Sequence, residues 1–101
     1  MTAAVLSRRA QRDLLTAVRW IARDNPAAAR GLREAVASAS RRIGAHPESG
    51  VLRPDLADSP YRFMMLAGFP YLVVYNADRH PPLILRVLHG ARDLPTVLRN
   101  L

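Results

Sequence analysis

The most constraining feature of this chain is a pair of segments, 71–76 and 83–89, that are apolar at nearly every position. Successive side chains of a β-strand point to opposite faces of the sheet, so a strand with one wet face alternates apolar and polar residues. These segments do not: every residue from Tyr71 to Tyr75 is apolar. We therefore predict a sheet that is covered on both faces.

Two amphipathic helices precede these strands. From 8 to 24 the apolar residues recur at helical spacing, and Ser7 is suited to cap the start of that helix. Asn25-Pro26 ends it and starts another, because proline fits the first helical position. The second apolar stripe runs to Ile43, and Gly44 is predicted to be the glycine that ends the helix. So short a connection makes an antiparallel helical hairpin.

The helical hairpin also carries most of the charge. The net charge is +7, all 15 basic residues are arginine, and residues 7–45 hold nine of them against three acids, or +6. Four arginines, at positions 8, 12, 19 and 23, share the face of the first helix opposite its apolar stripe. Such a row is more often a solvated face than a nucleic-acid contact. Trp20 lies at the flank of the stripe, where we predict that it packs against the second helix.

The remaining segments complete an α+β fold. Residues 3–6 form a candidate first strand, and 48–60 is predicted to be a loop. Three strands, 61–66, 71–76 and 83–89, are joined by short turns and so form an antiparallel meander. We predict one domain over residues 1–101: an N-terminal strand and an antiparallel two-helix hairpin packed on a mainly antiparallel sheet with a three-stranded C-terminal meander.

One helical hairpin covers one face of such a sheet. The other face then requires the C-terminal segment 94–101, a second copy of the chain, or another protein. The tail is eight residues long and could cover only part of it. We therefore expect an obligate or near-obligate binding partner.

Several kinds of chemistry are poorly supported. The chain has no cysteine, which excludes disulfides and thiolate chemistry. His46, His80 and His89 lack metal-ligand spacing, and there is no phosphate-binding glycine loop. We expect neither a metal nor a cofactor. The N-terminus is not a signal peptide and no apolar run reaches the roughly 20 residues of a membrane span, so we expect a cytoplasmic protein without membrane contact.

RNA cleavage is the enzymatic hypothesis that the residues allow. Cleavage through the 2′-hydroxyl needs a proton acceptor, a proton donor for the leaving oxygen and cations on the phosphate. Each candidate also has an ordinary structural explanation, as a strand-end histidine, a core tyrosine or an arginine that reaches past the core to solvent. The candidate cations are Arg62, Arg86 and Arg92, and the candidate proton carriers are His89, Tyr61 and Tyr75.

Short segments along nearly the whole chain match those of a known protein superfamily and occur in the same order. They are Asp13-Leu14, Trp20-Ile21-Ala22, Asp24-Asn25-Pro26 with Ala28-Ala29, Ile43 through His46-Pro47 to Ser49-Gly50, Tyr61-Arg62, Tyr71 to Tyr75, and Ile84 to Asp93. With these segments the chain resembles the RelE/ParE toxins of bacterial type II toxin–antitoxin modules, and the ParE branch most.

The resemblance implies a toxin that is neutralised by a cognate, ParD-like antitoxin whose acidic C-terminal segment lies across it. The hetero-oligomeric complex would contact DNA through the antitoxin. ParE-like toxins act on DNA gyrase, which they trap on cleaved DNA, whereas RelE-like toxins cut messenger RNA in the ribosome. We expect gyrase contacts at Arg62, His89, Arg92 and Asp93, and antitoxin contacts at Trp20, Leu72, Val74, Ile84, Arg86 and Leu88.

The C-terminal residues favour the ParE branch. RelE-like nucleases typically use basic residues with a tyrosine or histidine near the C-terminus. Arg92 falls where their arginine would lie, but Leu98 stands where a tyrosine is expected, and the chain has no lysine. We predict a gyrase poison without hydrolytic chemistry. The alternative is a nuclease that uses Arg62, Arg86, His89 and Arg92.

Overall fold

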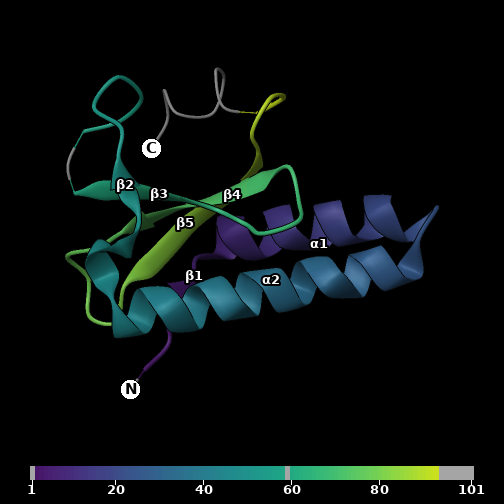
Figure 1. Cartoon of the computed structure of the whole chain (residues 1–101), viewed down its shortest axis with the longest axis horizontal. Coiled ribbons are helices and arrows are strands. Elements are labelled where there is room, and N and C mark those ends of the chain that lie inside the picture. Colours follow the sequence, from purple (N-terminus) through teal and green to yellow (C-terminus); the bar gives the residue numbers. More distant parts are fainter. Residues whose placement is uncertain (1, 59, 94–101) are drawn as a thin grey trace.

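A helical layer packs on one face of a mostly antiparallel sheet in the computed structural model, which describes residues 2–58 and 60–93 (Figure 1). The sheet order is β1-β5-β4-β3-β2, with β1 parallel to β5 and the other neighbours antiparallel. The predicted α+β fold is confirmed. The elements are β1 (Val5–Leu6), α1 (Arg8–Ala22), α2 (Pro26–Ala45), the 3-10 turn η1 (Pro47–Ser49), β2 (Val51–Leu52), β3 (Tyr61–Met65), β4 (Tyr71–Asn76) and β5 (Leu83–His89).

Helix α1 is fixed to the edge of β5 at its N-cap residue, Ser7. The Ser7 hydroxyl accepts the Ala10 N–H at 3.0 Å, as an N-cap does, and donates to the Leu85 carbonyl at 2.9 Å. The Ser7 N–H also donates to the Ile84 carbonyl at 2.9 Å. Because β1 pairs only with Leu83 and Ile84, the start of α1 supplies partners for the edge of β5 beyond them.

Helix α2 starts as predicted and ends later than predicted. The Asn25 side chain accepts the Ala28 N–H at 3.0 Å, and Pro26 is the first helical residue. The prediction that Gly44 ends the helix is wrong, since the helix runs through it to Ala45. A Cβ at Gly44 would lie 2.7 Å from Cα of Ala3, so glycine is needed here to let the N-terminal segment cross the helix.

The face of the sheet under the helices holds the larger core. Its sheet residues are fully buried and pack against the apolar stripes of both helices. Trp20 does not join this core, and its predicted packing against α2 is wrong: the side chain is 61% exposed, with the Arg23 guanidinium 5.4 Å from its ring centroid. Members of the core include Leu32, Val36 and Ile43 from α2 and Val73, Tyr75, Ile84 and Val87 from the sheet.

The opposite face has a smaller core of its own, formed by Phe63, Leu72, Val74 and Leu88. Leu56 and Ala57, from the segment before β3, pack against it together with Tyr61. The sequence prediction for the cover of this face was the tail, a second copy or another protein. That prediction overlooked the segment 53–58, while the tail 94–101 lies outside the described residues.

The predicted loop 48–60 is partly ordered by a buried hydroxyl. Tyr75 is fully buried, and its hydroxyl donates to the Pro47 carbonyl at 2.6 Å and accepts the Gly50 N–H at 2.8 Å. These bonds hold η1 beside the sheet, and β2 then pairs with β3 through Val51 and Leu52.

No helix of the described chain is long and apolar enough to cross a membrane.

Candidate functional site

A cleft of about 260 Å³ opens between α1 and the end of β5. It brings together residues far apart in the sequence, because α1 lies along the edge of β5. Its charged lining contains both signs, with three arginines and two aspartates. The lining residues are Arg12, Asp13, Thr16 and Ala17 from α1, and Tyr71, Arg86, Val87, Arg92 and Asp93 from the sheet and its exit.

A largely buried ion pair forms the floor of this cleft. Arg86 donates to the Asp13 carboxylate from Nε at 2.7 Å and from Nη2 at 2.9 Å. The side chains are only 12% and 17% exposed. The same carboxylate accepts the Val87 N–H at 3.1 Å, so it also binds the edge of β5. The hydrogen bonding of Arg86 to the Asp13 carboxylate raises the pKa of Arg86 above its ordinary value, although burial acts against this.

The Arg86 guanidinium therefore binds a carboxylate. The ordinary structural explanation considered for Arg86, that it reaches past the core to solvent, is wrong. Asp13 was not among the residues predicted from the sequence to have a functional role. The signal was available: Asp13 directly precedes Leu14 of the apolar stripe, and an arginine stands inside the apolar strand 83–89. A buried acid and a buried base each require a partner, and pairing them satisfies both.

The exit of β5 forms a second, more exposed cluster. Asp93 accepts the His89 N–H at 2.8 Å and the Arg92 Nε–H at 3.1 Å. Burial raises the pKa of Asp93, but the hydrogen bonds from Arg92 and from the His89 backbone together lower it below its ordinary value. Nδ1 of His89 accepts the Arg92 N–H at 3.2 Å, so a neutral ring carries its proton on Nε2. The ring packs edge-on against Tyr71, 5.3 Å between centroids.

Only some of the residues predicted to contact gyrase or to cleave RNA therefore lie close together. Arg86, His89, Arg92 and Asp93 lie at or beside the cleft. Arg62 does not, because its guanidinium donates to the carbonyls of Gly50 at 2.9 Å and Glu48 at 3.3 Å. Of the candidate proton carriers, Tyr75 uses its hydroxyl to hold η1, and Tyr61 packs with the smaller core.

The predicted antitoxin contacts do not form one surface. Leu72, Val74 and Leu88 belong to the smaller core, whereas Ile84 is fully buried under the helices. Arg86 pairs with α1, and Trp20 is exposed near the far end of that helix. In the described structure these six residues lie in four different environments.

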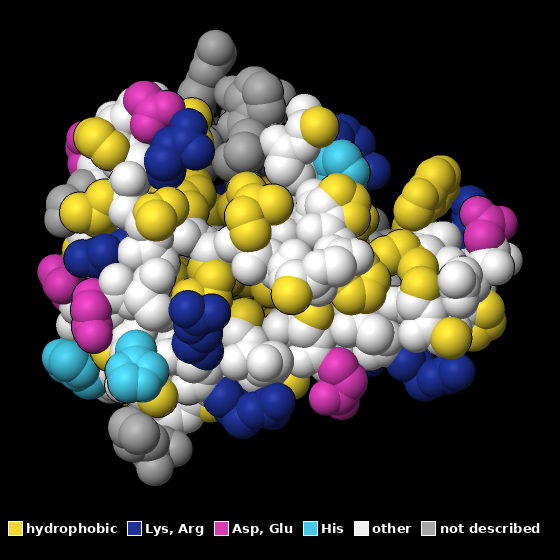
Figure 2. Space-filling view, in the orientation of Figure 1, with side chains coloured by type: hydrophobic (Ala, Val, Ile, Leu, Met, Phe, Trp, Pro, Cys, Tyr) yellow, Lys and Arg dark blue, Asp and Glu magenta, His cyan; other side chains and the backbone are white. Residues whose placement is uncertain are grey.

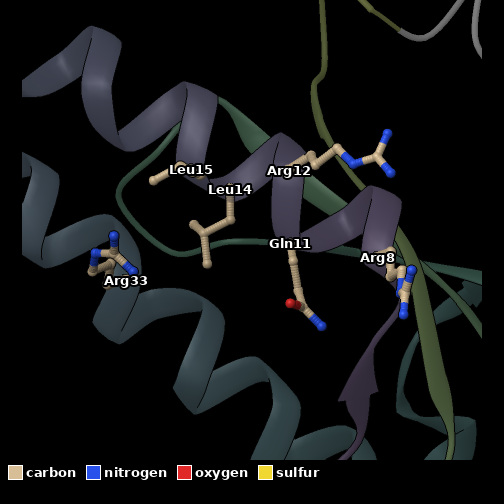
Figure 3. A pocket seen from close by; sticks show the side chains of 6 residues that line it. All are labelled: Arg8, Gln11, Arg12, Leu14, Leu15 and Arg33. Atoms are coloured by element: carbon tan, nitrogen blue, oxygen red, sulfur yellow. The ribbon is translucent and has the colours of Figure 1, made fainter.

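A larger groove, which was not predicted from the sequence, lies between the two helices (Figure 3). Its volume is about 530 Å³. Leucine side chains lie between arginines of both helices, and Leu15 is 40% exposed. An exposed leucine beside the apolar stripe was the available signal. The lining residues are Arg8, Gln11, Arg12, Leu14, Leu15 and Arg33. Arg12 borders both this groove and the cleft at β5.

Among residues 2–58 and 60–93, no three histidine, aspartate or glutamate side chains are grouped so that they could bind a metal ion. The arrangement offers instead paired charges in the cleft and an apolar groove with a basic rim. Both are features of binding surfaces.

Comparison with known structures identifies the fold. A chain described as the chromosomal ParDE TA system from P. aeruginosa has a TM-score of 0.70, with 19% sequence identity over 88% of this chain and 96% of that one. A search of curated proteins found no match.

Comparison with protein families identifies the class. The model of the ParE toxin of type II toxin-antitoxin system, parDE, matches residues 4–94. The chain belongs to this ParE toxin family.

Proposed function

We propose that this toxin poisons DNA gyrase in the cytoplasm and is neutralised by direct binding of a ParD-like antitoxin. The family match over residues 4–94 carries the proposal. The similar solved chain, described as part of a ParDE system, supports an antitoxin as the partner. The antitoxin would carry the contact of the hetero-oligomeric complex with its operator DNA.

The cleft at β5 supports binding over RNA hydrolysis. A nuclease aims cations at the phosphate, where charge develops in the transition state. Here Arg86 and Arg92 each already donate to a carboxylate, Asp13 and Asp93 respectively. A phosphate would have to displace Asp13 from Arg86, which binds the carboxylate through two nitrogens and is only 12% exposed. This favours a toxin that acts through contacts and not through acid–base chemistry.

The groove between the helices is the surface that best fits the antitoxin. An acidic, amphipathic helix can place apolar side chains on Leu14 and Leu15 and carboxylates beside Arg8, Arg12 and Arg33. A groove with these chemical features is what the predicted acidic C-terminal segment requires. The positive charge of the toxin would also speed the encounter by electrostatic steering.

Induction of the toxin alone in bacteria tests the target. We expect loss of supercoiling and DNA breaks, with intact messenger RNA. Cuts in messenger RNA at defined codon positions with intact DNA would refute the gyrase proposal, and no growth defect would refute toxicity.

The second candidate function, a ribosome-dependent endoribonuclease, is favoured only by the cluster of Tyr71, His89 and Arg92. His89→Ala separates the two. A gyrase poison keeps most of its toxicity without the imidazole, whereas a nuclease that relies on His89 for proton transfer loses it with unchanged folding. Circular dichroism provides the folding control.

A further inference from the structure

Most of the described arginines beyond the helices have a polar partner, Arg79 excepted, whereas those of the helices form no ion pair. Arg53, Arg86 and Arg92, all beyond the helices, form ion pairs, and Arg62 is bound to backbone carbonyls. The nine arginines of residues 8–45 form no ion pair with any described residue. In Figure 2, separate dark blue side chains stand at the lower margin of the molecule, where α2 runs in Figure 1, with a magenta side chain between them.

Four of these arginines form a straight row on α1. Arg8, Arg12, Arg19 and Arg23 follow one another at helical spacings of four, seven and four residues, which keeps them on one outward face. All four are exposed. At 1.5 Å per residue the row is about 22 Å long. A DNA strand presents a phosphate about every 3.4 Å along its axis, so the row spans roughly six phosphates.

The row opposes the stability of its own helix, which distinguishes it from an ordinary solvated face. Arg8 and Arg12 are like charges four residues apart, and so are Arg19 and Arg23. Arg8 and Arg9 also lie in the first turn, which contains no acid, beside the positive end of the helix dipole. An external polyanion would relieve each of these repulsions.

We infer that this α1 arginine row is a surface that binds the phosphate backbone of duplex DNA. The inference goes beyond gyrase poisoning and antitoxin binding, because it assigns the toxin a DNA contact of its own. Arginine suits phosphate through its fork of donors. Trp20, exposed and in cation–π contact with the Arg23 guanidinium, helps to hold that arginine at one end of the row. Such contacts carry no base specificity.

Fluorescence anisotropy with a labelled 20-base-pair duplex at several NaCl concentrations tests the inference on the purified full chain. The test variant is Arg12→Gln with Arg19→Gln. The matched control is Arg41→Gln with Arg79→Gln, which removes the same charge from exposed, unpaired arginines elsewhere in the described structure. Loss of two phosphate contacts lowers the affinity at 0.1 M salt by at least about tenfold and reduces the salt slope by about two. The control keeps the wild-type slope.

Three outcomes would overturn the inference: no binding by the wild type, equal losses in both double variants, or tighter row-dependent binding of a polyglutamate peptide than of DNA. Thermal unfolding guards against misfolding, since the test variant loses like-charge repulsion and is expected to be at least as stable as the wild type. Supercoiling assays keep the two proposals apart. Gyrase inhibition with row-independent DNA binding refutes only the DNA contact, and row-dependent binding without gyrase inhibition refutes only the gyrase target.

Discussion

Replacement of Asp13 by asparagine is expected to destabilise the fold by about 3 kcal/mol. Asp13 accepts two hydrogen bonds from Arg86 and one from the Val87 N–H. Asparagine keeps the shape but removes the charge, and its amide directs N–H groups at a guanidinium that has only donors. Removing one partner of a buried pair costs about 3–5 kcal/mol. The remaining exposure of 12% and 17% admits some water and places the expected loss at the lower end of that range.

Urea unfolding followed by circular dichroism measures the loss. The chain offers a matched control in Asp55→Asn. Arg53 binds Asp55 through the same two nitrogens, at 3.1 and 2.8 Å, but with side chains 48% and 61% exposed. Exposed pairs contribute little, so this variant is expected to keep the wild-type midpoint.

Equal losses in the two variants would refute the argument that burial makes the Asp13 pair important. A wild-type midpoint for Asp13→Asn would refute the pair itself. The double variant Asp13→Leu with Arg86→Met provides a further check. Replacing both partners leaves no unpaired charge, and most of the stability is expected to return.

Three further outcomes follow from the described contacts. Tyr75→Phe leaves the buried Gly50 N–H and the Pro47 carbonyl without partners and is expected to cost about 1–3 kcal/mol in urea unfolding, against no loss for Tyr61→Phe. Because the pKa of Asp93 is lowered in the fold, its contribution is present above its ordinary value of 3.8 and lost as pH falls through the lowered value. The stability curves of wild type and Asp93→Asn should therefore converge in acid; a constant gap would contradict this. Leu15→Glu should weaken binding of an acidic antitoxin peptide by at least about tenfold in calorimetry, whereas Leu52→Glu, at a similarly exposed leucine outside the groove lining, should not.

Local signals in the sequence account for most of the fold. The helices could be predicted because Ser7, Asn25 and Pro26 mark their starts and apolar stripes mark their inner faces. The three meander strands were predicted to within one residue, since short turns separate long apolar segments. Such signals depend on residues close together in the chain, so they can be recognised without knowledge of tertiary contacts.

The errors all involve contacts between distant residues. Gly44 has the local pattern of a helix end, but it is required by the crossing of Ala3. Strand β2 has two residues, too few for any periodicity, and its position depends on the Tyr75 hydroxyl, which binds Gly50 from 25 residues away. The cleft could be predicted in part, because Arg86, His89 and Arg92 share one segment. Its Asp13 comes from a helix 73 positions away in sequence.

The division of the arginines links the stability of this protein to its proposed activity. Two arginines at the sheet, Arg86 and Arg92, are paired with aspartates, and the fold depends on at least the buried pair. Those on α1 do the opposite: each like-charge pair four residues apart opposes the helix by about 0.2–0.5 kcal/mol. Such a cost persists in proteins where function requires it. Removing the α1 arginine row should then raise stability and lower toxicity together, whereas removing Asp13 should lower both. A variant of the row that is more stable than the wild type but equally toxic would show that the α1 arginine row does not contribute to toxicity.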